Sequence, residues 1–336
     1  MSGIVLNNIE TVKIRLYPRL HISLIGMHTS GYRINGGVGF SIDRPFLQVT
    51  CTPAANFEVA DSRSQPLSVE ACIRLQAIIE EQQRELLLEK SIYVSIEGDL
   101  LSNYGFGSGT AIRLACLESL FLLNNKHYTR KELVQASGRG GTSGIGINTY
   151  FDGGFVIDIG HRTTNSEVKP SNAVENLHRV PLQLVSHPFP PFEIGICIPK
   201  FISRLTQEQE SEFFKRTIPI PTTEVHKILY EVIYGLYPAV IESDMLIFAE
   251  SINNIQSCHW KKSEIMNYGS DIQEIIDDLK MLGATAAGMS SMGPCIYFVS
   301  PNINDTLEKA TTKYGCDRFV IFKTTPRNTG RDLSYA

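Results

Sequence analysis

The stretch Asn103-Tyr-Gly-Phe-Gly-Ser-Gly-Thr110 is the most informative part of the sequence for the fold. Its three alternating glycines lead directly into a segment, 108–123, whose apolar residues have helical spacing. Glycines at this spacing let backbone N–H groups approach a ligand closely, and a helix N-terminus favours an anion. The stretch has neither the Gly-Lys-Ser/Thr of a Walker A loop nor the third glycine of G-x-G-x-x-G. It is interpreted as an anion-binding loop, with a flexible linker ending in a Ser N-cap as the alternative. The candidate ligand-binding residues here are Gly105, Gly107, Ser108, Gly109 and Thr110.

A second glycine-rich segment, Gly138-Arg-Gly-Gly-Thr-Ser-Gly-Ile-Gly146, has five glycines in nine residues. A simple turn needs one or two glycines, and each additional one costs conformational entropy on folding. Arg139 can form a bidentate pair with a phosphate or a carboxylate. A binding function is therefore favoured over a mobile surface loop. The candidate residues are Arg139, Gly140, Gly141, Thr142 and Ser143.

Three further segments carry candidate residues whose patterns are weaker when each is taken alone. Arg19 and His21 alternate on one face of a predicted strand, and Gly36-Gly37-Val-Gly39 follows; the competing interpretation is a solvated sheet face with a hairpin turn. Asp158 and His161 lie at the end of a predicted strand. The segment 288–294 contains Ser290 and Ser291, and the competing interpretation there is a tight β-turn.

The order of predicted elements indicates an α+β protein. Predicted strands cover 11–17, 19–26, 46–52, 91–97, 155–159, 192–198, 295–299 and 318–323, and predicted helices cover 67–90, 108–123, 129–137, 223–234, 239–255, 270–281 and 304–314. A length of 336 residues favours two domains, and the polar, Pro-rich stretch 162–191 is the candidate boundary. The predicted domains are 1–180 and 181–336.

Composition excludes several classes of protein. The net charge of −4 and the absence of a Lys/Arg run argue against nucleic-acid binding. The seven dispersed cysteines form no C-x-x-C, so neither a disulfide framework nor a zinc site is expected. No apolar run approaches the length that spans a bilayer, and no signal peptide is recognised, so a cytoplasmic protein without membrane contact is expected.

Taken in order, these segments resemble motifs of the GHMP superfamily, which includes galactokinase and mevalonate kinase. GFGSGT resembles its phosphate loop, and GMSSMGP at 288–294 resembles its third motif. The closer resemblance, over most of the chain, is to the β-ribofuranosylaminobenzene 5′-phosphate synthase family. It implies an α+β, two-domain GHMP-kinase-like fold, with an N-terminal domain like ribosomal protein S5 and a ferredoxin-like C-terminal domain.

The family resemblance also implies a reaction. Phosphoribosyl pyrophosphate condenses with 4-aminobenzoate to form a C-riboside, releasing carbon dioxide and pyrophosphate, in methanopterin biosynthesis. Related enzymes of C-nucleoside antibiotic pathways use a heteroaromatic carboxylate of the pyrazole type. Mg²⁺ is expected with the pyrophosphate, although no acidic residue is singled out by spacing as a ligand. The implied partners are phosphoribosyl pyrophosphate and an aromatic or heteroaromatic carboxylic acid, with a homodimer as a candidate assembly.

On this resemblance, Gly105–Thr110 would bind phosphate, and Arg139–Ser143 would hold a second phosphate or the acceptor carboxylate. Arg19 and His21 would line the reacting centre, and Ser290 and Ser291 would close the site. Gly146 stands where GHMP kinases have a catalytic Asp, so ordinary kinase chemistry is disfavoured. The stretch Leu24-Ile-Gly26 also lacks an acidic residue of the synthase pattern, which leaves the acceptor open. An ATP-dependent small-molecule kinase and a non-catalytic ligand-binding protein are the remaining alternatives.

Overall fold

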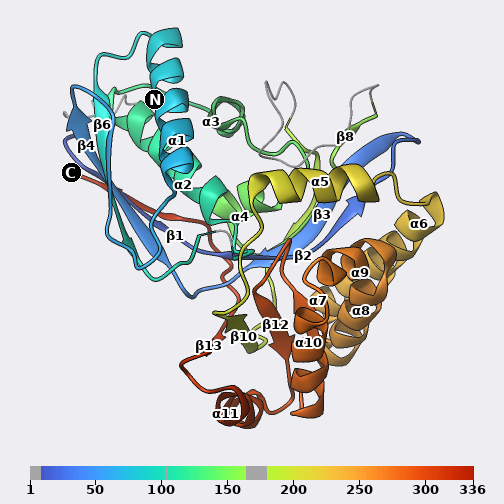
Figure 1. The fold of residues 1–336 in the computed structure, drawn as a ribbon. Helices are drawn as coiled ribbons and strands as arrows, with labels where there is room; N and C mark the ends of the chain where they lie inside the picture. Colours follow the sequence, from blue (N-terminus) through green and yellow to red (C-terminus); the bar gives the residue numbers. More distant parts are fainter. Residues whose placement is uncertain (1–8, 103, 164–179) are drawn as a thin grey trace.

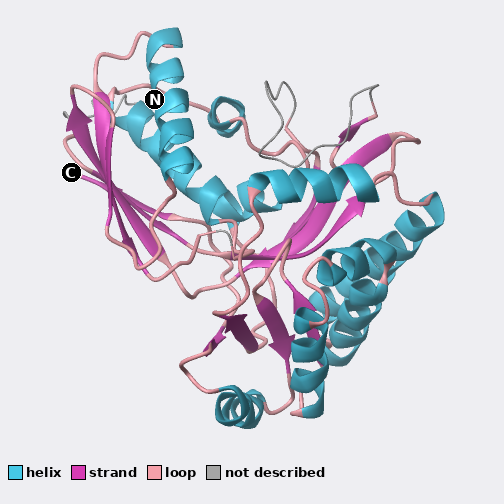
Figure 2. Cartoon of the chain, in the orientation of Figure 1, coloured by secondary structure: helices cyan, strands magenta, loops and turns pink. Residues whose placement is uncertain are grey.

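A computed structural model describes residues 9–102, 104–163 and 180–336 (Figure 1). Within these residues the chain forms three sheets, which helices cover (Figure 2). An extended apolar cluster runs from the first sheet through the second to the helices of the second half, and a separate cluster lies around the third sheet. No described helix is both long enough and apolar enough to cross a bilayer.

The first sheet has the strand order β14-β1-β4-β6-β5. Its strands are β1 (Val12–Leu16), β4 (Leu47–Ala54), β5 (Glu58–Asp61), β6 (Ser91–Gly98) and β14 (Asp332–Tyr335). Buried and exposed residues alternate along β1 because one face of the strand packs on the core. Helices α1 (Val69–Glu85) and α2 (Ser108–Leu123) accompany this sheet, and α2 is buried along almost its whole length. The sheet thereby fixes the N-terminal end of α2.

The second sheet forms the middle of the molecule. Its strands are β2 (Arg19–Gly26), β3 (Arg33–Ser41), β7 (Phe155–Asp158) and β9 (Gln183–His187), with β8 (His161–Arg162) paired to β3. Helix α4 (Ile145–Asp152) packs against β2, β3 and β7, and helices of the second half pack against β2. Continuous burial along β2 and β3 follows from this coverage by helices.

The third sheet is antiparallel, with the order β11-β12-β10-β13. Its strands are β10 (Ile194–Pro199), β11 (Ala286–Met289), β12 (Ile296–Val299) and β13 (Phe319–Thr324). Along the chain, one strand is followed by helices, two strands, a helix and a last strand, and this is a ferredoxin-like arrangement.

The remaining helices are α3 (Arg130–Ser137), α5 (Gln207–Thr217), α6 (Thr222–Tyr230), the π-helical turn η1 (Glu231–Leu236), α7 (Tyr237–Glu242), α8 (Met245–Ser257), α9 (His259–Met266), α10 (Asp271–Met281) and α11 (Ile303–Tyr314). Helix α5 lies across the centre of Figure 1 beside α4, while α6 to α10 gather below it. Residues of α5, α4 and β2 line one cavity.

Several sequence predictions are wrong in detail. The helix predicted over 239–255 is two helices, because Ser243 adopts a positive φ of 58° and Asp244 caps α8. The hairpin turn considered for Gly36–Gly39 is instead the buried centre of β3. The glycine run 138–146 ends inside helix α4, which was not predicted. Helices α5 and α9 and strands β5, β11 and β14 were also missed.

The division of the chain at 180/181 stays a prediction, and its proposed linker lies partly outside the described residues, over 164–179. Strand pairing crosses this division twice. Strand β9 pairs with β7, and β14 at the C-terminus pairs with β1. Both strands follow residue 180 in the sequence but join the sheets of the first half.

Candidate active site

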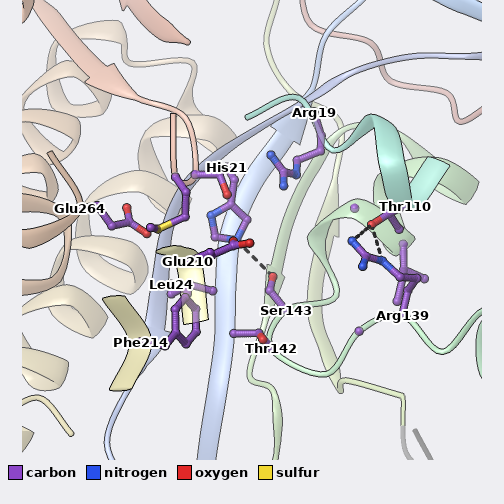
Figure 3. A pocket seen from close by; sticks show the side chains of 15 residues that line it. Arg19, His21, Leu24, Thr110, Arg139, Thr142, Ser143, Glu210, Phe214 and Glu264 are labelled. Atoms are coloured by element: carbon purple, nitrogen blue, oxygen red, sulfur yellow. Dashed lines mark hydrogen bonds between the residues drawn. The ribbon is translucent and has the colours of Figure 1, made fainter. Parts of the chain in front are cut away.

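A cavity of about 110 Å³ lies where the second sheet, α2, α4 and α5 meet the loop after β11 (Figure 3). Eight of the predicted site residues line it: Arg19, His21, Thr110, Arg139, Gly140, Thr142, Ser143 and Ser291. These residues come from four segments spread over most of the chain. The fold therefore brings the separate sequence motifs to one site.

Arg139 and Thr110 connect the two glycine-rich segments. The guanidinium of Arg139 donates to Thr110 Oγ1 from Nε, at 3.0 Å, and from Nη2, at 2.8 Å (Figure 3). Burial lowers the pKa of Arg139 to about 10, so the side chain is still a cation at neutral pH. Its planar group is thereby held in one orientation beside the start of α2.

Arg19 is a second cation of the cavity, and its side chain is partly buried. Its Nη1 donates to the carbonyl oxygen of Gly105 at 2.5 Å, and its Nε is buried with no hydrogen-bond partner among the described residues. Burial lowers its pKa to about 10 as well. Both guanidinium groups line the same cavity, and both can donate hydrogen bonds to an anionic ligand.

His21, Ser143 and Asp158 form a continuous hydrogen-bonded chain. His21 Nε2 lies 3.2 Å from Ser143 Oγ, and Ser143 Oγ donates to Asp158 Oδ2 at 3.1 Å. Burial lowers the pKa of His21 well below its usual value, so its ring is neutral at neutral pH. With the Ser143 proton directed to Asp158, the proton of His21 lies on Nε2 and Nδ1 is left as an acceptor.

Asp158 lies behind the cavity and does not line it. It accepts hydrogen bonds from the backbone N–H groups of Gly144, at 2.9 Å, and Gly160, at 3.0 Å. Burial raises its pKa to about 6, although these hydrogen bonds act in the opposite direction. Asp158 therefore positions Ser143 and the start of α4.

The loop after β11 joins the site through the backbone of His21. The N–H of His21 donates to Ser290 Oγ at 3.0 Å, and its carbonyl accepts from the N–H of Ser291 at 2.9 Å. The register between β2 and β3 shifts between His21 and Ser23, so the backbone N–H and carbonyl of His21 are available to bond with Ser290 and Ser291. Ser290 also donates to Gly105 at 2.7 Å, so it fastens the loop before α2 and does not line the cavity.

Two glycines are required by close approaches at the site. A Cβ on Gly37 would lie 2.8 Å from His21 Nε2 and 2.8 Å from Ser143 Oγ. Gly105 has a φ of 90°, and a Cβ there would lie 2.2 Å from the carbonyl oxygen of Ser290. The glycines leave space for neighbouring residues, and this is a role distinct from contact with a ligand.

The remaining predicted residues surround the cavity without lining it. Gly36 donates to the carbonyl of Thr142 at 2.9 Å, Gly141 accepts from Asn35, and His161 Nε2 lies 2.9 Å from the carbonyl oxygen of Gly140. These contacts hold the glycine-rich segment against β3. Gly107, Ser108 and Gly109 start α2 without facing the described cavity.

Gly146, the position matched to the kinase Asp, also lines the cavity, and six lining residues were not predicted as site residues: Leu24, Ile147, Glu210, Phe214, Glu264 and Met292. Glu210 and Phe214 lie on α5. Glu264 lies on α9, where it accepts from Trp260 Nε1 at 2.8 Å and forms a 2.6 Å ion pair with the buried Lys261. The capping box of Thr206 and Gln209 could have revealed α5, but no local signal gives the position of its carboxylate.

Comparison with known proteins identifies the family. No family model matches the sequence. The chain is 30% identical over 296 residues to the β-ribofuranosylphenol 5′-phosphate synthase of Methanothermobacter thermautotrophicus. This alignment covers 84% of the present chain and 86% of the relative. It is also 30% identical over 340 residues to the protein of that name from Methanocaldococcus jannaschii. This alignment covers 94% of the present chain and 98% of the relative.

Solved structures confirm the GHMP kinase fold. Homoserine kinase from Cytophaga hutchinsonii superposes with a TM-score of 0.68 at 14% identity, covering 99% of this chain and 100% of that one. Mevalonate kinase from L. major superposes with a TM-score of 0.66 at 15% identity, covering 98% and 100%. Together with the sequence relatives, these similarities show that the chain belongs to the β-ribofuranosylphenol 5′-phosphate synthase family within the GHMP fold.

Proposed function

We propose that this protein transfers the phosphoribosyl group of phosphoribosyl pyrophosphate to a ring carbon of an aromatic carboxylate, with release of carbon dioxide and pyrophosphate. The observation that carries the proposal is the pair of partly buried cations, Arg19 and Arg139, on a cavity lined by the neutral His21. Such an arrangement suits a polyanionic substrate whose reaction develops positive charge at the anomeric carbon.

Each group has a distinct role in the proposed reaction. The guanidinium groups and Thr110 of α2 bind phosphate oxygens and stabilise the negative charge of departing pyrophosphate. Because His21 is neutral, its ring does not repel the positive charge that develops on the ribose. The ring carbon that bears the carboxylate attacks the anomeric carbon, and loss of carbon dioxide restores aromaticity. Positioning of the two substrates supplies much of the rate.

Mg²⁺ enters this proposal as part of the substrate, bound to pyrophosphate oxygens, which supply most of the ligands that Mg²⁺ prefers. Among the described residues, no three His, Cys, Asp or Glu side chains gather as potential ligands of a metal ion. Of the two carboxylates that line the cavity, Glu264 is already paired with Lys261.

The names of the sequence relatives bear on the acceptor. A ribofuranosylphenol product carries a hydroxyl group on its ring, and this favours 4-hydroxybenzoate over 4-aminobenzoate as acceptor. Both acids have an electron-donating substituent opposite the carboxylate, and both fit the proposed chemistry. A heteroaromatic carboxylate is the third candidate.

Gly146 supports this function over a kinase. It lines the cavity beside Thr110, and a Cβ at this position would lie 3.6 Å from Thr110 Cβ, in ordinary contact. A side chain would fit at position 146, yet the sequence has none there. The position matched to the kinase Asp therefore offers no carboxylate to accept a proton from an alcohol.

The test measures pyrophosphate release from phosphoribosyl pyrophosphate and Mg²⁺ in the presence of 4-hydroxybenzoate, 4-aminobenzoate or a pyrazole dicarboxylate. We expect release that depends on one of these acceptors. A parallel assay with ATP and either homoserine or mevalonate should show no turnover. ATP turnover without acceptor-dependent pyrophosphate release would instead identify a kinase, and binding without either reaction would identify a ligand-binding protein.

A further inference from the structure

We infer that α5 recognises the acceptor, with Glu210 accepting the proton of a hydroxyl group on the aromatic ring and Phe214 packing against the ring. This inference rests on the proposed function and adds a residue that takes part in the chemistry. It also gives a physical reason for an acceptor with a protic substituent opposite its carboxylate.

The geometry of α5 supports this role. Glu210 and Phe214 are four residues apart, so they lie on one face of the helix, and both line the cavity. Phe214 is 3% exposed. The start of the helix is fixed because Thr206 and Gln209 form a capping box one residue before Glu210. A carboxylate and an aromatic side chain are thus presented together by a single well-anchored turn.

The cavity has two chemically different sides. In Figure 3, Thr110 and Arg139 lie on one side of His21, Leu24, Phe214 and Glu264 lie on the other, and the Glu210 side chain reaches from the second group to a position just below His21. The first side suits phosphate. The second combines apolar side chains with carboxylates, which repel phosphate but accept hydrogen bonds from hydroxyl groups. A planar ring with a hydroxyl group matches the second side in both respects.

Glu210 differs from Glu264 in what its carboxylate already contacts. Glu264 accepts from Trp260 and pairs with Lys261, whereas the Glu210 carboxylate has no hydrogen bond or ion pair with another described residue. Burial raises the pKa of Glu210, the neighbouring Glu264 raises it further, and Arg139 and Arg19 lower it. A partly buried carboxylate with a raised pKa is a stronger proton acceptor than a fully solvated one.

The proposed step begins with a proton transfer from the acceptor to Glu210. The ring hydroxyl gives its proton to Glu210, and the electron pair of the O–H bond increases the electron density of the ring. The ring carbon bearing the carboxylate forms a bond to the anomeric carbon as the bond to pyrophosphate breaks. The carbon–carboxylate bond then breaks, carbon dioxide leaves, and its electron pair restores the aromatic ring. The ring oxygen recovers the proton from Glu210.

The experiment compares Glu210→Gln with Glu208→Gln, which makes the same change at an exposed position of α5. We expect kcat/KM for 4-hydroxybenzoate to fall about 100-fold in Glu210→Gln and to stay unchanged in Glu208→Gln. The KM for phosphoribosyl pyrophosphate and the Tm should change little in either variant. Calorimetric titration should show that the wild type binds 4-hydroxybenzoate more tightly than benzoate, and that Glu210→Gln loses this preference.

Each other outcome has a definite meaning. A Glu210→Gln variant with wild-type kinetics and acceptor preference would overturn the inference and leave the proposed function standing. An increased Mg²⁺ requirement with unchanged acceptor preference would make Glu210 a metal ligand and also overturn it. A wild-type protein that consumes no phosphoribosyl pyrophosphate with any acceptor would instead remove the proposed function itself.

Phe214→Leu gives an independent test that survives if Glu210→Gln fails to fold. Leucine keeps an apolar side chain on α5 but removes the aromatic face. We expect the KM for 4-hydroxybenzoate to rise about 10-fold, because an aromatic contact is lost, while the KM for phosphoribosyl pyrophosphate stays within about twofold. Equal increases in both KM values would contradict the assignment of α5 to the acceptor.

Discussion

His21 and Ser143, separated by 122 positions in the sequence, meet at the cavity with Nε2 of the imidazole 3.2 Å from the hydroxyl oxygen. Ser143 in turn donates to Asp158, so one hydroxyl group fixes both the tautomer of the histidine and the position of the glycine-rich segment. Ser143 and Asp158 together therefore leave Nδ1 of the neutral His21 as a hydrogen-bond acceptor, and neither residue needs to touch the substrate to do so.

Removal of the Ser143 hydroxyl tests this chain of contacts. In Ser143→Ala, the Nε2–H of His21 loses its acceptor, at a cost of about 1–3 kcal/mol. We expect kcat to fall about 10- to 100-fold, with a smaller change in the KM for phosphoribosyl pyrophosphate. Steady-state kinetics would measure both, and Ser186→Ala, on the exposed side of β9, serves as the control. Unchanged kcat in Ser143→Ala would show that the His21 orientation does not depend on this contact.

Gly37→Ala tests the space between His21 and Ser143. Its Cβ would lie 2.8 Å from an atom of each side chain, so the two must separate. Gly26→Ala is the matched control, because its Cβ would lie 2.8 Å from the Asn35 carbonyl oxygen on the same pair of strands. We expect both substitutions to lower the Tm and only Gly37→Ala to lower kcat strongly in protein that remains folded. Equal loss of kcat in the two variants would argue for a general effect of strain.

Arg139 is expected to bind phosphate or the acceptor carboxylate through its fork of N–H donors. Arg139→Ala should raise the KM for phosphoribosyl pyrophosphate at least about 10-fold, and Arg139→Lys should recover only part of the loss because lysine is a point charge. The exposed Arg318→Ala, whose guanidinium lies over Phe201, controls for loss of positive charge. Full activity in Arg139→Ala would remove this assignment.

Asp158 should make the free energy of unfolding depend on pH. Burial raises its pKa from 3.8 to about 6, so the folded protein binds this proton more tightly than the unfolded chain. The contribution to stability is therefore largest below pH 3.8 and is lost as pH rises through about 6. Between pH 5 and 7.5 the loss should be on the order of 1 kcal/mol.

Urea unfolding of the wild type and of Asp158→Asn at both pH values measures this contribution. The change in the free energy of unfolding between the two pH values is compared in the two proteins, so the effects of the other titrating groups cancel. We expect the variant to be less stable overall, since asparagine cannot accept all the same hydrogen bonds, but to lose less stability as the pH rises. An identical pH dependence in the two proteins would show that the carboxyl group is not perturbed.

The sequence predicts the parts of the site that local patterns determine. The bounds of α2, Ser108–Leu123, and of β2, Arg19–Gly26, are confirmed, because glycines and apolar periodicity mark them directly. The family and the fold are confirmed through the order of motifs along the chain. The roles of the individual site residues stay predictions that the experiments above address.

The remaining features depend on contacts between distant segments. Gly37 looks like a turn residue in the sequence, and its actual role, to make room for His21 and Ser143, exists only after β3 and the start of α4 have packed together. Glu210 sits on a polar helix with no local mark of function. Glu210 becomes part of the cavity only when α5 packs in the folded protein, and the sequence alone does not distinguish it from the other acidic residues.

The most direct test of the central claim uses 4-hydroxybenzoate labelled with ¹³C in its carboxyl group, together with phosphoribosyl pyrophosphate and Mg²⁺. The account predicts that labelled carbon dioxide and pyrophosphate are released in equal amounts, with a product whose ribose is joined to the ring by a carbon–carbon bond. Pyrophosphate release with the label retained in the product would contradict it, because ribosyl transfer would then have occurred without decarboxylation.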